Sequence, residues 1–194
     1  LLDKYEDKLG DYMMRIMGGD SVPDLEWELD KALSSISDLE RLGDHAMNVM
    51  ELAVEMQEKH IAFSEEAEEE LKYFTEAVRE VTTIACTSFI KEDEKEALKV
   101  EPLEEVIDIM CDELKLRHVA RLQSGQCTIA VGFVFNDLLT NCERVADHCS
   151  NLGICTLKSL NPQYMPHEYS SSVEASATFT EHFLNFTEKY VSNL

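Results

Sequence analysis

Glycine, proline and basic residues are scarce in this chain. Its 194 residues include 7 Gly and 4 Pro, so turns are few and the elements between them are long. Lysine and arginine number 17 against 39 aspartate and glutamate residues, a formal net charge of −22. Such a chain repels the phosphates of nucleic acids and anionic lipids and suits cation binding. An acidic surface also serves solubility alone, so the placement of the acids has to decide.

Several familiar motifs are absent as well. No apolar run approaches the roughly 20 residues that span a bilayer, and no signal peptide opens the chain. The phosphate-binding loop, the dinucleotide fingerprint and H-E-x-x-H are missing, and no serine or cysteine stands beside a plausible base. The six cysteines form no C-x-x-C pair, which favours reduced core thiols in a reducing compartment. The sequence therefore indicates no reaction centre, and we expect no enzyme.

Hydrophobic residues recur at helical spacing almost throughout, which predicts an all-α fold. Six helices are expected, over residues 1–17, 24–59, 65–90, 93–122, 127–159 and 168–192. Ser64 is the expected N-cap of the third helix, and Pro102 an expected kink in the fourth. Because the first residues read as helix interior, we expect the first helix to lack its natural start.

One phrase of the sequence occurs twice, at an offset of 103 residues (from 40 to 143). Residues 38–53 read DLERLGDHAMNVMELA and residues 141–156 read NCERVADHCSNLGICT. The identical pairs are Glu40 and Glu143, Arg41 and Arg144, Asp44 and Asp147, His45 and His148, and Asn48 and Asn151. A repeat of about half the chain predicts a duplicated unit. We therefore expect two tandem antiparallel three-helix bundles, residues 1–94 and 95–194.

The repeated phrase carries acids four residues apart, which share one face of a helix. These pairs are Glu40 with Asp44 and Glu143 with Asp147, and the helix before each carries a further pair, Asp3 with Asp7 and Glu104 with Asp108. Residues at one height of an antiparallel hairpin are symmetric about its turn. Asp3 with Asp44 centres on residues 23–24, and Glu104 with Asp147 on residues 125–126, both at predicted turns. Each hairpin is thus predicted to bring four carboxylates to one level.

Converging carboxylates favour a hard cation such as Mg, Ca, Mn or iron. His45 and His148 each follow an acid and are open to three roles: metal ligand, hydrogen-bond donor to a ligand, or contact between helices. Asn48 and Asn151 lie one turn further on and could bond a ligand carboxylate. The competing interpretation is a charge ladder along one helix, from glutamate through arginine to aspartate.

With these acids the chain resembles the PhoU family of phosphate-uptake regulators. The residues that carry the resemblance are Glu40-Arg41-Leu42-Gly43-Asp44, Glu143-Arg144-Val145-Ala146-Asp147 and Glu104-Glu105-Val106-Ile107-Asp108, with Asp3–Asp7 as the fourth pair. Residues 103–151 look like the PhoU-like domain at the C-terminus of bacterial sodium/phosphate cotransporters. The resemblance implies a cytoplasmic regulatory domain that binds multinuclear iron or zinc clusters. It would lie at the inner face of the cell membrane, joined to the transporter's membrane domain.

Two alternatives remain. One is a purely structural helical module that dimerises or spaces a membrane transporter, with solvated acids. The other is a carboxylate-bridged metalloenzyme, which needs an open coordination position and a general base, His45 or His148.

Overall fold

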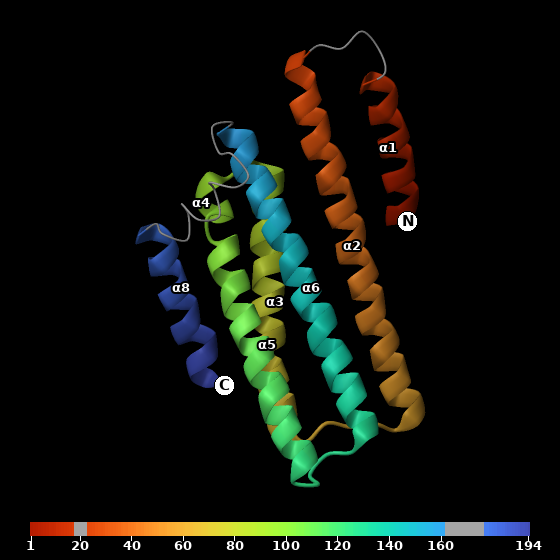
Figure 1. The fold of residues 1–194 in the computed structure, drawn as a ribbon, viewed down its shortest axis with the longest axis vertical. Helices are drawn as coiled ribbons and strands as arrows, with labels where there is room; N and C mark the ends of the chain where they lie inside the picture. Colours follow the sequence, from red (N-terminus) through yellow and green to blue (C-terminus); the bar gives the residue numbers. More distant parts are fainter. Residues whose placement is uncertain (18–22, 162–176) are drawn as a thin grey trace.

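The computed structural model describes residues 1–17, 23–161 and 177–194, and the regular elements in these ranges are all helices (Figure 1). They are α1 (Leu2–Met17), α2 (Pro23–Lys59), α3 (Glu65–Lys91), α4 (Glu94–Ala97), α5 (Val100–Gln123), α6 (Ile129–Leu160), α8 (Ala177–Tyr190) and the 3-10 turn η1 (Val191–Asn193). The prediction of an all-α fold is confirmed. The start of the sixth predicted helix, residues 168–176, lies outside the described residues.

Side-chain caps set where two of the long helices begin. The Ser64 hydroxyl accepts the Ala67 N–H at 3.3 Å, as its predicted role as N-cap of α3 requires. Thr128 caps α6 in the same way, accepting the Val131 N–H at 3.3 Å. Each cap satisfies one of the N–H groups that a helix leaves without a partner in its first turn.

The predicted helix over residues 93–122 is divided in two. Asp93 caps the short α4, and a new helix, α5, begins at Val100. Pro102 lies in the first turn of α5, where a missing N–H costs nothing. The prediction of a kink at Pro102 is therefore wrong: the break comes before the proline, which helps α5 to begin.

Helix α6 lies at the centre of the fold. It packs against α2, α3 and α5, and α8 lies on the outer side of α5. The core between α3, α5 and α6 is fully buried, with Phe74, Leu103, Ile107, Met110 and Leu139 at 0% exposure. Burying side chains of this size stabilises the fold by about 1.5–3 kcal/mol each.

Helices α1 and α2 form a hairpin that reaches the rest of the fold through α2 (Figure 1). Gly43 lies where α1 meets α2, and a Cβ added there would stand 2.2 Å from a methyl carbon of Leu2. Helix α3 packs on α5 and α6, so it shares its core with the second half of the chain. The finer expectation of two separate three-helix bundles is therefore not confirmed, and the boundary near residue 94 stays a prediction.

Across the described ranges, every helix is too short or too polar to cross a membrane.

Candidate functional site

Three carboxylates of the second half of the chain meet between α5 and α6. Oxygens of Glu104, Asp108 and Asp147 lie within 4.8 Å of one another; we call these residues the second acid cluster. The hairpin argument predicted that Glu104 and Asp147 would lie at one level, and the structure places them so. Like charges this close repel strongly unless protons or a cation lie among them.

Electrostatics in the second acid cluster favour neutralisation. Burial, together with the charge of Asp108, raises the pKa of Glu104 to about 8. Burial and the nearby Glu143 raise the pKa of Asp108 to about 6. Asp108 Oδ1 is buried and has no hydrogen-bond partner among the described residues. A carboxylate oxygen in that state lacks a proton, a water or a metal ion to satisfy it.

Glu143 is the predicted fourth member, and the structure places it beside the cluster. Its Oε2 accepts a bond from Lys115 Nζ at 3.0 Å and one from the Cys111 thiol at 3.5 Å. The lysine neutralises this carboxylate from α5. The charge of Glu143 still raises the pKa of Asp108, while its Oε2 already accepts these two bonds.

The equivalent first acid cluster lies between α1 and α2 and consists of Asp3, Glu40 and Asp44, again with oxygens within 4.8 Å. Asp7, the fourth predicted member, is not among these oxygens. Burial and the charge of Asp44 raise the pKa of Glu40. The Asp44 side chain is 49% exposed, so water screens this cluster more than the second one.

The charge-ladder interpretation is also visible. Arg144 Nη1 lies 3.0 Å from Asp147 Oδ2. Arg41 lies 3.9 Å from Asp44 and 3.7 Å from Glu40. Both arginines are well exposed, and exposed pairs of this kind contribute only about 0–1 kcal/mol. The ladder thus accompanies the clusters without neutralising their buried oxygens.

The histidines and asparagines of the repeat contact the opposite helix. His45 Nδ1 lies 2.9 Å from Asn141 Oδ1, and Asn48 Nδ2 donates to the same oxygen at 2.9 Å. The other copy makes the equivalent contacts: His148 Nδ1 and Asn151 Nδ2 bond Asp38 Oδ1 at 2.9 and 3.0 Å. The two imidazoles stack with centroids 5.7 Å apart. We call these six residues the interhelical clasp.

The clasp shows one of the three roles left open for the histidines, a contact between helices. Since the amide and carboxylate oxygens accept, each histidine donates through Nδ1–H. All four repeated side chains therefore join α2 to α6, and none is bonded to an acid of either cluster. Asp38 and Asn141 complete the clasp and were missed, although they open the two copies of the phrase at the same offset.

Comparison with known proteins points to one family. Residues 71–155 match the family model of the PhoU domain. The chain is also 31% identical over 116 residues to the phosphate-specific transport system accessory protein PhoU homolog 1 of Thermotoga maritima. That alignment covers 60% of this chain and 49% of the relative, so the chain spans about half the length of the curated relative it matches. No solved structure matches the chain significantly.

The matched segment has a clear place in the fold. Residues 71–155 run from α3 through most of α6 and include the whole second acid cluster. The first acid cluster lies outside them. The expected resemblance to PhoU proteins is thus supported for the central part of the chain, and the fusion to a sodium/phosphate cotransporter stays a prediction.

Proposed function

We propose that this chain is a metal-binding regulatory domain linked to phosphate transport. The observation that carries the proposal is the second acid cluster, where a buried Asp108 oxygen has no partner beside two further carboxylates. The relative's printed name, an accessory protein of a phosphate-specific transport system, supports the link to transport. The same printed name, which describes an accessory protein, supports a regulatory role rather than an enzymatic one.

At neutral pH a bound cation would replace the proton that burial holds on Glu104 and would balance the charge of Asp108. The oxygen-only ligand set fits iron, zinc, manganese, magnesium or calcium, and favours the harder ions among them. Because the ligands come from both helices of each hairpin, metal would tie α5 to α6 and α1 to α2. Occupancy would thus set how rigidly each hairpin holds its shape, which is a property that a transporter can sense.

We place the domain on the cytoplasmic side of the membrane, joined to the membrane part of a phosphate transporter. Its partners are that membrane domain and, as a second option, another copy of itself. Nucleic acid is an unsuitable partner for a chain of net charge −22.

One observation favours the alternative of a purely structural module. The α1–α2 hairpin exposes several large apolar side chains, including Tyr12, Met47 and Met50 at 63%, 52% and 49% exposure. Where exposed apolar side chains gather into a patch, they often mark interaction sites. The metal measurement below separates the two functions.

Elemental analysis of protein purified without metal-affinity resin tests the proposal. We expect more than one metal ion per chain, and less metal in the double variant Glu104→Gln/Asp108→Asn. The matched control is Glu65→Gln/Glu69→Gln, an exposed acid pair at the same spacing on α3, which should keep the full metal content. A wild-type chain that stays metal-free after incubation with iron, manganese and zinc would leave only the structural module.

A further inference from the structure

We propose that a second site, a cavity between the N-terminal ends of α3 and α6, binds a small oxyanion. The cavity has a volume of about 200 Å³. Its polar lining comes from Ser64, His118, Arg121, Gln126 and Thr128, with Phe135 behind them. We call it the two-cap cavity, because Ser64 and Thr128 are the N-caps of the two helices.

Two buried side chains that line the two-cap cavity have polar atoms without partners among the described residues. Arg121 is 6% exposed; its Nη1 donates to Glu70 at 2.8 Å, while Nη2 is buried with no partner among the described residues. His118 is also 6% exposed and its Nε2 has no partner among the described residues, but that nitrogen lies close to Gly132, which lines the neighbouring cavity. Leaving such groups unsatisfied is costly, so their partner is expected to come from outside the protein.

The polar groups of the two-cap cavity that can still form hydrogen bonds are mainly donors. The guanidinium of Arg121 can only donate. The Ser64 and Thr128 hydroxyls accept the bonds that cap their helices, so each still has its own proton to give. Gln126 Oε1 lies 3.0 Å from the Ser124 hydroxyl, which leaves its NH₂ group free to donate. A lining of donors calls for a ligand made of acceptors.

Helix geometry adds to this preference. The N-terminus of a helix carries a partial positive charge and unpaired N–H groups, and anions bind there readily. Here two such ends, at Ser64 and Thr128, border one cavity. The unpartnered buried Nη2 of Arg121 is a separate observation that points to the same class of ligand.

Nearby acids do not cancel the site. Glu70, the carboxylate closest to Arg121, is buried between two arginines, since Arg117 Nη1 also lies 3.3 Å from it. The first-turn acids of α3, Glu65, Glu66 and Glu68, are exposed to water, which screens their repulsion. Burial and the charge of Arg121 lower the pKa of His118, so its ring is neutral at pH 7 and can donate through one nitrogen.

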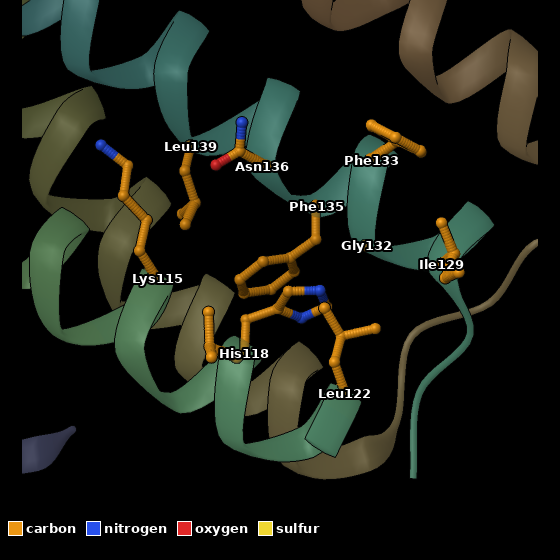
Figure 2. Close-up of a pocket in the computed structure, with 10 residues that line it drawn as sticks. Lys115, His118, Leu122, Ile129, Gly132, Phe133, Phe135, Asn136 and Leu139 are labelled. Atoms are coloured by element: carbon orange, nitrogen blue, oxygen red, sulfur yellow. The ribbon is translucent and has the colours of Figure 1, made fainter. Parts of the chain in front are cut away.

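The neighbouring cavity differs in kind, which sharpens the assignment. It has a volume of about 320 Å³ and a lining that is mainly apolar (Figure 2). His118 and Phe135 line both cavities and stack at 4.7 Å between ring centroids. Lys115, the cation in the apolar cavity, is already paired with Glu143. The donor-rich surroundings thus lie on the two-cap side.

Inorganic phosphate is the first probe, and that choice alone rests on the proposed function; the oxyanion site stands on its own geometry. The experiment follows the ring signals of isotope-labelled histidines by NMR while phosphate, sulfate or acetate is added in separate titrations with chelator present. Chelator keeps metal out, so the result does not depend on the acid clusters.

We expect a saturable shift of the His118 signals at millimolar phosphate, with those of His45, His60 and His148 unchanged. Saturation by sulfate as well would establish a general oxyanion site, and saturation by phosphate alone a selective one. If none of the three anions moves His118 in a saturable way, the unpartnered atoms are satisfied by water and the proposal is overturned.

A variant pair locates the binding. Arg121→Met should weaken phosphate binding by about tenfold or more, the loss expected when a bond to a charged group is removed. The matched control Arg79→Met changes an exposed arginine on α3 and should leave the affinity as it is. Equal affinity in wild type and a folded Arg121→Met would contradict the assignment. Should Arg121→Met fail to fold, the wild-type titration still decides.

Discussion

The two hairpins of this chain share a sequence pattern and differ in burial. In the second hairpin, α5–α6, Cys149 and Leu157 are 0% and 3% exposed, because Cys149 belongs to the core shared with α3 and Leu157 packs with Ala97 of α4. The residues at the same places in the first hairpin, α1–α2, are Ala46 and Val54; Ala46 is exposed and Val54 is 47% exposed. The same helical pattern thus forms a core in one half and a surface in the other.

The comparison extends to the acid clusters. Both gather three carboxylates within 4.8 Å, yet the pKa of Glu104 rises to about 8 while Asp44 stays half exposed. The repeat determines which acids converge, and burial determines how far their pKa values rise. We therefore expect the second acid cluster to bind metal more tightly than the first.

The largest expected effect compares a covered face of α6 with the equivalent exposed face of α2. Cys149→Lys places an unpaired charge in the core and should cost at least about 3 kcal/mol. The equivalent Ala46→Lys should stay within about 0.5 kcal/mol, as exposed substitutions do. Urea denaturation of both variants measures this. An Ala46→Lys variant as unstable as Cys149→Lys would mean that the first hairpin is covered in solution.

The next effect concerns the pH dependence of the second acid cluster. The pKa of Glu104 is raised from 4.5 to about 8, so the folded chain holds a proton that the unfolded chain releases. The free energy of unfolding should therefore fall as pH rises from about 5 to 8 in chelator, lowering Tm by about 2–4 °C for each kcal/mol lost. Thermal melts of Glu104→Gln should show a smaller fall, whereas Glu40→Gln should change the profile little. A wild-type Tm that does not decline over this range would contradict the argument.

A smaller effect tests the interhelical clasp. Asp38→Ala and Asn141→Ala each leave an imidazole and an amide without their acceptor, and should cost about 1–2 kcal/mol. Asp38→Asn keeps an acceptor oxygen and makes the two copies alike, so it should change stability by less than about 0.5 kcal/mol. Chemical denaturation provides the values, and unequal costs of the two alanine variants would show that the copies of the clasp are not equivalent.

The smallest effect is expected for the exposed arginines. Arg41→Ala and Arg144→Ala should each change stability by no more than about 0.5 kcal/mol without metal. Arg144→Ala should have the larger effect, since its contact of 3.0 Å is closer than the 3.9 Å of Arg41. Raising the salt concentration should remove the difference, and a difference that persists at high salt would point to a buried role.

Much of the fold was predictable because hydrophobic spacing reports helices directly. The helices over residues 24–59, 65–90 and 127–159 lie within two residues of α2, α3 and α6. The partner of α3 was not predictable, since periodicity identifies the apolar face of a helix but not what covers it. The break before α5 was missed because Pro102 reads the same at a kink and at a helix start.

Only part of the candidate sites could be predicted from the sequence. Symmetry about the turns predicted that Asp3 lies near Asp44 and Glu104 near Asp147, because an antiparallel hairpin leaves little freedom in height. The bond of Glu143 to Lys115 was not foreseen, since it depends on the orientation of a long side chain. The two-cap cavity had no motif at all: Ser64, His118, Arg121 and Thr128 come together only in the folded chain.

The interhelical clasp also bears on the history of the chain. Each half contributes a histidine and an asparagine that bond one acceptor oxygen in the other half. Contacts that are exchanged in this way are typical of a symmetric dimer interface. When two identical subunits associate, one gene encodes both and every substitution appears twice. In the fused chain each half can change alone, as the pair Asp38 and Asn141 already shows. A duplication, which the repeated phrase predicts, would leave the α5–α6 hairpin free to form part of a core while the α1–α2 hairpin keeps exposed faces.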